Sequence, residues 1–146
     1  MIELIVTVVI LGLILSGIAI MFSNILTTQS NVTAQSDGMI RGQSFASKIE
    51  KAMRDGSAFS ATANSLIVQF GSGPSATCKT FNAATAKVRL EGGTITFTSA
   101  GTNGIHYLFR AIGGEAADPV PSTASPVRFS GEAYLRNTTS VVLTCW

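Results

Sequence analysis

The chain has 146 residues, a net charge of +2 and a mean hydropathy of +0.38. Charged residues make up 12% of it, about half the share in an average soluble protein. This composition excludes an intrinsically disordered chain, which would be charged and poor in apolar residues, and it argues against an ordinary cytosolic enzyme. The small net charge gives no reason to expect a protein that coats nucleic acid.

The N-terminal region contains a long apolar segment. Glu3 is the first charged residue and Asp37 the second, and Leu4–Phe22 is apolar except for Thr7 and Ser16. Its length is close to the roughly 20 residues that a helix needs to cross a bilayer. A lone segment in lipid must satisfy its own backbone hydrogen bonds, so we expect a membrane helix over residues 1–26.

Three simpler interpretations compete with this one. A secretory signal peptide needs a basic start and a small-residue cleavage site, but Glu3 stands where positive charge is expected. A soluble core helix would have to be surrounded on all sides, which so small a domain can scarcely do. A plain single-pass anchor explains the hydrophobicity but not the acidic residue at its start.

The helix is expected to continue through residues 27–55 as an amphipathic segment without proline. Its apolar stripe consists of Phe45, Ile49, Ala52 and Met53, spaced i, i+4, i+7 and i+8. A wider repeat of seven runs through Ile25, Val32, Met39, Ala46 and Met53.

The sequence around Arg54 predicts the end of this helix. Arg54 gives a basic last turn, and Gly56 is expected in the left-handed region as a cap. Glu50 is placed for an i,i+4 ion pair with Arg54.

The glycines in the apolar segment have two interpretations. Gly12 and Gly17 mark either points of bending or places where another helix packs closely. Gly12 and Ser16 are four residues apart, which fits the small-residue spacing of close helix packing.

Residues 56–146 predict a globular antiparallel β domain, because short β-rich runs alternate with turn residues and no helix-length pattern separates them. A hairpin turn is expected at Glu91–Thr94 and another turn at Asn103–Gly104. One face of the sheet needs an apolar cover, which the stripe on the preceding helix can supply. We therefore predict an α+β fold, with a long N-terminal α-helix packed on an antiparallel β-sheet. The expected strands are 65–70, 77–82, 86–91, 94–98, 105–112, 127–129, 133–136 and 140–144.

The two cysteines, Cys78 and Cys145, have no metal-site spacing. A domain beyond a membrane helix lies in an oxidising compartment, where a disulfide between them is favoured. Two buried free thiols are the alternative.

The start of the chain, Met1-Ile2-Glu3-Leu4 followed by IVTVVILGLILSGIAI, resembles the mature N-terminus of type IV pilins and pseudopilins. The resemblance implies a long helix on an antiparallel sheet, often with a disulfide near the C-terminus. It also implies that Glu3 and the N-terminal residue, here Met1, guide assembly of the subunits. The family glutamate is the fifth mature residue, behind a leader that ends in Gly, whereas here it is the third.

The resemblance also bears on the helix interior. Many family members have a proline late in the apolar run, where this chain has Gly17–Phe22. Unwinding at this point would therefore depend on Gly17.

The residues give no indication of catalysis, a cofactor or a metal site. His106 is the only histidine and lies in a strand-like run, without a second histidine or a Cys–His pair. Arg89, Arg110, Arg128 and Arg136 could form a basic patch for DNA, but scattered surface charge is the preferred interpretation.

The resulting hypothesis is a structural pilin subunit, not an enzyme. It would sit in the cytoplasmic membrane through its helix, meet inner-membrane assembly machinery there, and polymerise with copies of itself into an extracellular filament for adhesion or motility. Two alternatives stay open: a minor pilin or pseudopilin for secretion or DNA uptake, and a membrane-anchored extracytoplasmic binding module that never polymerises.

Overall fold

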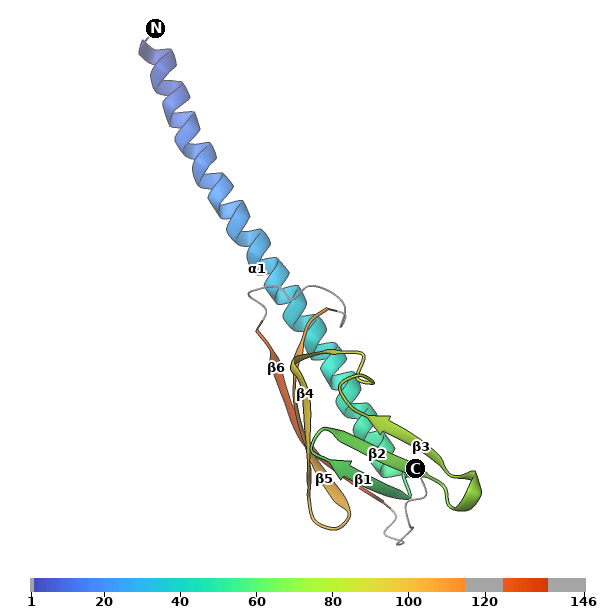
Figure 1. The fold of residues 1–146 in the computed structure, drawn as a ribbon. Coiled ribbons are helices and arrows are strands. Elements are labelled where there is room, and N and C mark those ends of the chain that lie inside the picture. The colour runs from blue at the N-terminus through green and yellow to red at the C-terminus, as the bar shows by residue number, and fades with distance from the viewer. Residues whose placement is uncertain (1, 115–124, 137–146) are drawn as a thin grey trace. The chain divides into compact units, whose positions relative to one another are not determined.

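The protein is described by a computed structural model over residues 2–114 and 125–136. Helix α1 (Ile2–Asp55) comes first, and strands follow it (Figure 1). The chain divides into two compact units, residues 1–33 and residues 34–146. The N-terminal unit is helical, and the C-terminal unit holds the last turns of α1 with all the strands. The later elements are β1 (Ala58–Thr62), β2 (Ser65–Phe70), the 3-10 helix η1 (Gly73–Ser75), β3 (Thr77–Phe81), β4 (Arg89–Ser99), β5 (Gly104–Ile112) and β6 (Val127–Tyr134).

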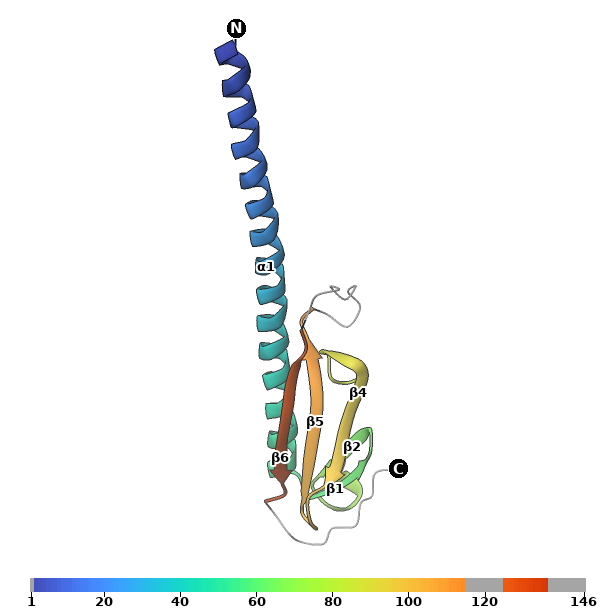
Figure 2. The same ribbon diagram turned by 90° about the vertical axis from the view of Figure 1, so that its left-hand side faces the viewer.

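The strands confirm the predicted α+β class but form two antiparallel sheets instead of one. Their orders are β1-β2-β3 and β4-β5-β6. Figure 2 shows the second sheet alongside the C-terminal turns of α1. The sheets also meet each other, since the Phe97 amide donates to the Ala63 carbonyl at 2.9 Å. The helix therefore covers a core to which two separate sheets contribute.

The predicted stripe on α1 is confirmed, because Phe45, Ile49, Ala52 and Met53 are all buried. The Phe45 ring makes edge contacts with Phe81 of β3 at 6.2 Å and with Phe109 of β5 at 5.4 Å between centroids. One helix side chain thus packs on both sheets. Aromatic pairs of this kind add about 0.5–1.5 kcal/mol each beyond the burial of apolar area.

The repeat of seven is not buried over its first members. Ile25, Val32 and Met39 are exposed, and burial on α1 begins at Gly38. A repeat in the sequence can predict an apolar stripe, but only a packed neighbour buries that stripe.

Two helix glycines let the sheet approach α1 closely. A Cβ at Gly42 would lie 2.2 Å from the Phe129 ring, and one at Gly38 would lie 2.9 Å from the Gly113 nitrogen. A side chain at either position would have to push the sheet away. Glycine therefore serves packing here, not bending.

Polar contacts fix the same face of the helix. The Tyr107 hydroxyl donates to Glu50 Oε1 at 2.7 Å. Burial, and then the bond to Glu50, raise the pKa of Tyr107. Among the described residues, the i,i+4 ion pair on α1 joins Asp37 and Arg41. The predicted pair between Glu50 and Arg54 is not among the ion pairs of these residues, so that prediction is wrong. Glu50 bonds across to the sheet instead of along its own helix.

The predicted hairpin at Glu91–Thr94 is also wrong, because β4 runs through it. Gly92 and Gly93 have the positive φ that such a turn needs, +68° and +63°. The register instead shifts between Leu90 and Ile95, which pair with Ala111 and Phe109 of β5. Four residues of β4, Glu91–Thr94, lie opposite the single residue Arg110 of β5, so the extra backbone forms an irregular bulge.

Other boundaries differ in smaller ways. α1 ends at Asp55 as predicted, but Gly56 does not adopt a positive φ. Its missing side chain instead makes room for Val68 Cγ1, 2.5 Å from where a Cβ would lie. β1 was not predicted, and β6 is one continuous strand where two were expected. The expected strand 140–144 lies outside the described residues.

Candidate functional site

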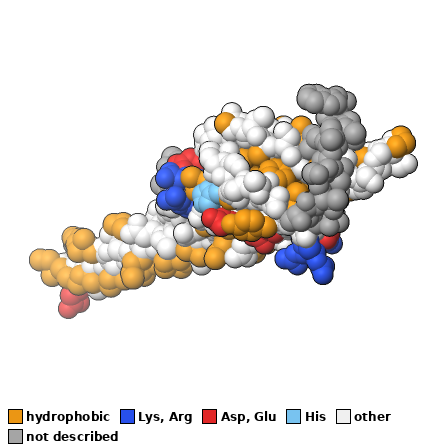
Figure 3. All heavy atoms as spheres, turned by 90° about the horizontal axis from the view of Figure 1, so that it is seen from below, with side chains coloured by type: hydrophobic (Ala, Val, Ile, Leu, Met, Phe, Trp, Pro, Cys, Tyr) orange, Lys and Arg blue, Asp and Glu red, His pale blue; other side chains and the backbone are white. Residues whose placement is uncertain are grey.

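The candidate site is the apolar surface of the N-terminal unit. Every large apolar side chain from Ile2 to Phe22 is at least 45% exposed. Figure 3 shows hydrophobic side chains gathered along this part of the helix. So large a contiguous apolar surface is rare on a soluble monomer and marks contact with lipid or with other protein.

The hydroxyls within this surface are satisfied locally. Thr7 Oγ1 donates to the Leu4 carbonyl at 2.9 Å, and Ser16 Oγ donates to the Leu13 carbonyl at 2.8 Å. The later threonines of the unit also donate their hydroxyls to backbone carbonyls one turn earlier in the helix. They are Thr27, Thr28 and Thr33. These hydroxyl groups can therefore enter an apolar environment without losing a donor bond to water.

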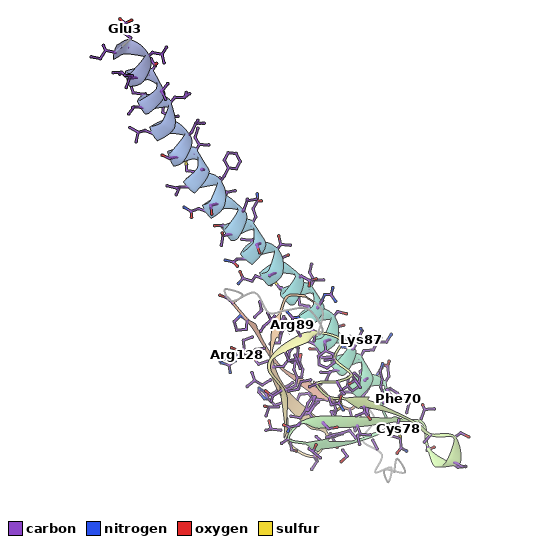
Figure 4. The ribbon with its side chains drawn as sticks, turned by 45° about the horizontal axis from the view of Figure 1, so that its top comes forward. Glu3, Phe70, Cys78, Lys87, Arg89 and Arg128 are labelled. Atoms are coloured by element: carbon purple, nitrogen blue, oxygen red, sulfur yellow. The ribbon has the colours of Figure 1, made fainter. Side chains whose placement is uncertain are left out.

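Glu3 lies in the first turn of α1 (Figure 4). The N-terminal end of a helix stabilises a carboxylate by about 0.3–1 kcal/mol. That is far less than the cost of burying an unpaired charge in lipid or protein. A charged Glu3 without a partner is therefore unfavourable wherever its surroundings exclude water. Met1 lies outside the described residues.

The small residues of the surface have no packing role within the described chain. A Cβ at Gly12 or Gly17 would meet no atom within 4 Å, and α1 continues through both without a break. Ser16 lies on the same exposed segment. The space beside Gly12 and Gly17 is not filled by the described part of this subunit, so it is open to another molecule.

Cys78 lies on β3 opposite Gln69 and is not a free thiol. Cys145 lies outside the described residues, so the pairing of the two cysteines stays a prediction.

The remaining candidates from the sequence do not form one site. Arg89 is buried, and Arg110 is paired with Glu91 at 2.9 Å. Arg110 on β5 and Arg128 on β6 are cross-strand neighbours, so two positively charged residues lie side by side there. Arg89 is not part of this pair. His106 lies in β5, and the described residues contain no cluster of metal-ligating side chains.

A second surface feature was missed by sequence reasoning. A hollow in the C-terminal unit is lined by Lys48, Lys79 and Lys87. These lysines come from α1, from β3 and from the loop before β4, so no spacing pattern in the sequence connects them.

No family model matches the chain, and neither the curated proteins nor the solved structures include a significant match. Within the described residues, one helix, α1, is long and apolar enough to cross a membrane.

Proposed function

We propose that the protein is a pilin-like subunit that is held in the membrane by α1 and then polymerises through it into an extracellular filament. The observation that carries this proposal is the exposed apolar surface of Ile2–Phe22. A membrane covers such a surface in the single subunit, and neighbouring helices would cover it in a filament. The glycines at positions 12 and 17 leave room for close approach of those helices.

Glu3 would set the axial register of the subunits. When helices bundle and water is excluded, its carboxylate would pair with the N-terminal ammonium of a neighbouring subunit. A subunit in the wrong register would leave both charges buried and unpaired, which is strongly unfavourable. The C-terminal unit would then form the outer surface of the filament.

The test is electron microscopy of material sheared from cells that express the full chain. We expect filaments that contain the wild-type protein and a loss of most filaments for Glu3→Ala. Thr7→Ala is the matched control, because Thr7 lies one turn away and its hydroxyl bonds only its own helix in this structure. The control should assemble as the wild type does.

Other outcomes would change the proposal. Intact filaments from Glu3→Ala would overturn the register role of Glu3 alone. A wild-type protein found only in the membrane fraction would favour the anchored binding module. Filaments too sparse to see, with lost secretion or DNA uptake in the deleted strain, would favour a minor pilin or pseudopilin.

A further inference from the structure

The lysine-lined hollow has a volume of about 290 Å³ and lies in the C-terminal unit. Three exposed lysines line it: Lys48 on α1, Lys79 on β3 and Lys87 in the following loop. Its other lining residues are the phenylalanines Phe45 and Phe81 and the smaller residues Thr80, Thr85 and Ala86. The hollow is at the small end of the range for ligand pockets and combines a cationic lining with an apolar one.

No carboxylate neutralises these lysines within the part of the chain that the structure describes. The ion pairs found there join Asp37 with Arg41 and Glu91 with Arg110. None of the described residues that line the hollow is acidic. The lining therefore carries three positive charges, which attract an anion.

The lining is held in place by local structure. Lys79 Nζ lies 5.4 Å from the centre of the Phe81 ring, a cation–π contact at the edge of the hollow. In the loop that follows, the Thr85 amide donates to Asn82 Oδ1, and the Asn82 amide donates to Thr85 Oγ1, both at 2.9 Å. These reciprocal bonds restrain the loop that carries Lys87.

Lys87 has an unusual backbone. Its φ is +50°, and it is the one residue other than glycine with a positive φ among those described. This conformation is sterically unfavourable for a residue that carries a side chain. Buried Ala86 and Val88 fix the chain on either side of it. Figure 4 shows Lys87 beside the C-terminal turns of α1.

We infer that this hollow binds a small organic anion, a phosphate or sulfate monoester whose charged group meets the three lysines. The apolar body of the ester would lie over the apolar part of the lining, where the edges of the largely buried Phe45 and Phe81 side chains border the hollow. A free inorganic ion would use the charge of the hollow but not its apolar wall. The inference concerns the C-terminal unit alone and does not depend on filament assembly.

The test is calorimetric titration of the full chain in a non-ionic detergent with phenyl phosphate. Phenyl sulfate, inorganic phosphate and phenol are titrated in parallel. We expect saturable binding of phenyl phosphate, weaker binding of the singly charged sulfate ester and of inorganic phosphate, and no binding of phenol. Lys79→Gln and Lys48→Gln should each weaken the binding of phenyl phosphate about tenfold, the effect of losing one charge-assisted hydrogen bond.

Lys51→Gln is the matched control, since Lys51 is exposed on the same helix, carries the same charge and does not line the hollow. It should bind phenyl phosphate as the wild type does. Circular dichroism of each variant separates lost binding from lost folding. The inference is overturned if phenyl phosphate shows no saturable binding at millimolar concentration, if Lys51→Gln weakens binding as much as Lys79→Gln, or if phenol binds equally well.

Discussion

Asp37 is the residue that ties α1 to the end of β5. Its Oδ2 atom accepts a hydrogen bond from the Gly114 amide at 2.9 Å, and its carboxylate also pairs with Arg41. The Gly114 bond first, and the Arg41 bond second, hold the pKa of Asp37 below its ordinary value of 3.8. A carboxylate with a lowered pKa stabilises the folded state only while it is ionised.

This contact predicts an acid-dependent loss of stability. The contribution of Asp37 is fully present above pH 3.8 and is lost as the pH falls through the lower pKa of the folded state. Asp37→Asn should therefore be less stable than the wild type at pH 6, and the difference should shrink toward pH 2. Urea unfolding midpoints between pH 2 and pH 6 measure it.

Arg41→Gln separates the two partners of Asp37. It removes the ion pair but keeps the Gly114 amide bond, so its loss at pH 6 should be the smaller one. A difference between Asp37→Asn and the wild type that stays constant down to pH 2 would contradict the role of the charge.

At the scale of the element, β4 shows how a turn sequence can serve a strand. Gly92 and Gly93 have the backbone of a hairpin turn but lie within one strand, at the irregularity opposite β5. The pairing on both sides of them continues with the same partner strand. The long-range partner decided the structure, because the same local geometry is compatible with a turn and with a bulge.

Gly93 gives a test of this element. A Cβ at Gly93 would meet no atom within 4 Å, so only its φ of +63° opposes a side chain. Gly93→Ala should lower the free energy of unfolding by about 1–2 kcal/mol, and Gly93→Asn by less, because asparagine enters the left-handed region more readily. Chemical denaturation measures both.

Equal stability of the two Gly93 variants would argue against backbone strain as the cause. Gly12→Ala is the control for a glycine-to-alanine change with helical backbone and open space, and it should not destabilise the C-terminal unit.

At the scale of the whole molecule, the two units differ in what they need for stability. The buried residues of α1 all lie at Gly38 or later, with the sheets, while the apolar residues before Thr33 remain exposed. The C-terminal unit holds the hydrophobic core described around Phe45. The N-terminal unit adds apolar surface without adding to that core.

A chain that starts at Ala34 should therefore fold and stay monomeric without detergent. The full chain should associate unless lipid or detergent covers its helix. Far-UV circular dichroism and sedimentation velocity measure the folding and the association. An unfolded or aggregated shortened chain would show that residues before Ala34 contribute to the fold.

Much of the helix was predictable from the sequence. Its end at Asp55, its buried stripe and its apolar first half follow from local periodicity and composition, which neighbouring residues determine together. The same holds for the candidate site, because Glu3 is the one charge in the first 36 residues. The exposure of the segment and the locally bonded hydroxyls of Thr7 and Ser16 are observed in the structure, and the assembly role of Glu3 stays a prediction.

The tertiary structure alone decided the rest. The division into two sheets, the bulge at Gly92–Gly93 and the bond from Tyr107 to Glu50 all join residues far apart in the chain. The hollow shared by Lys48, Lys79 and Lys87 has the same origin. Local sequence determines which backbone conformations are low in energy. Which strands pair, and which charged side chains come together, depends on the packing of the whole core.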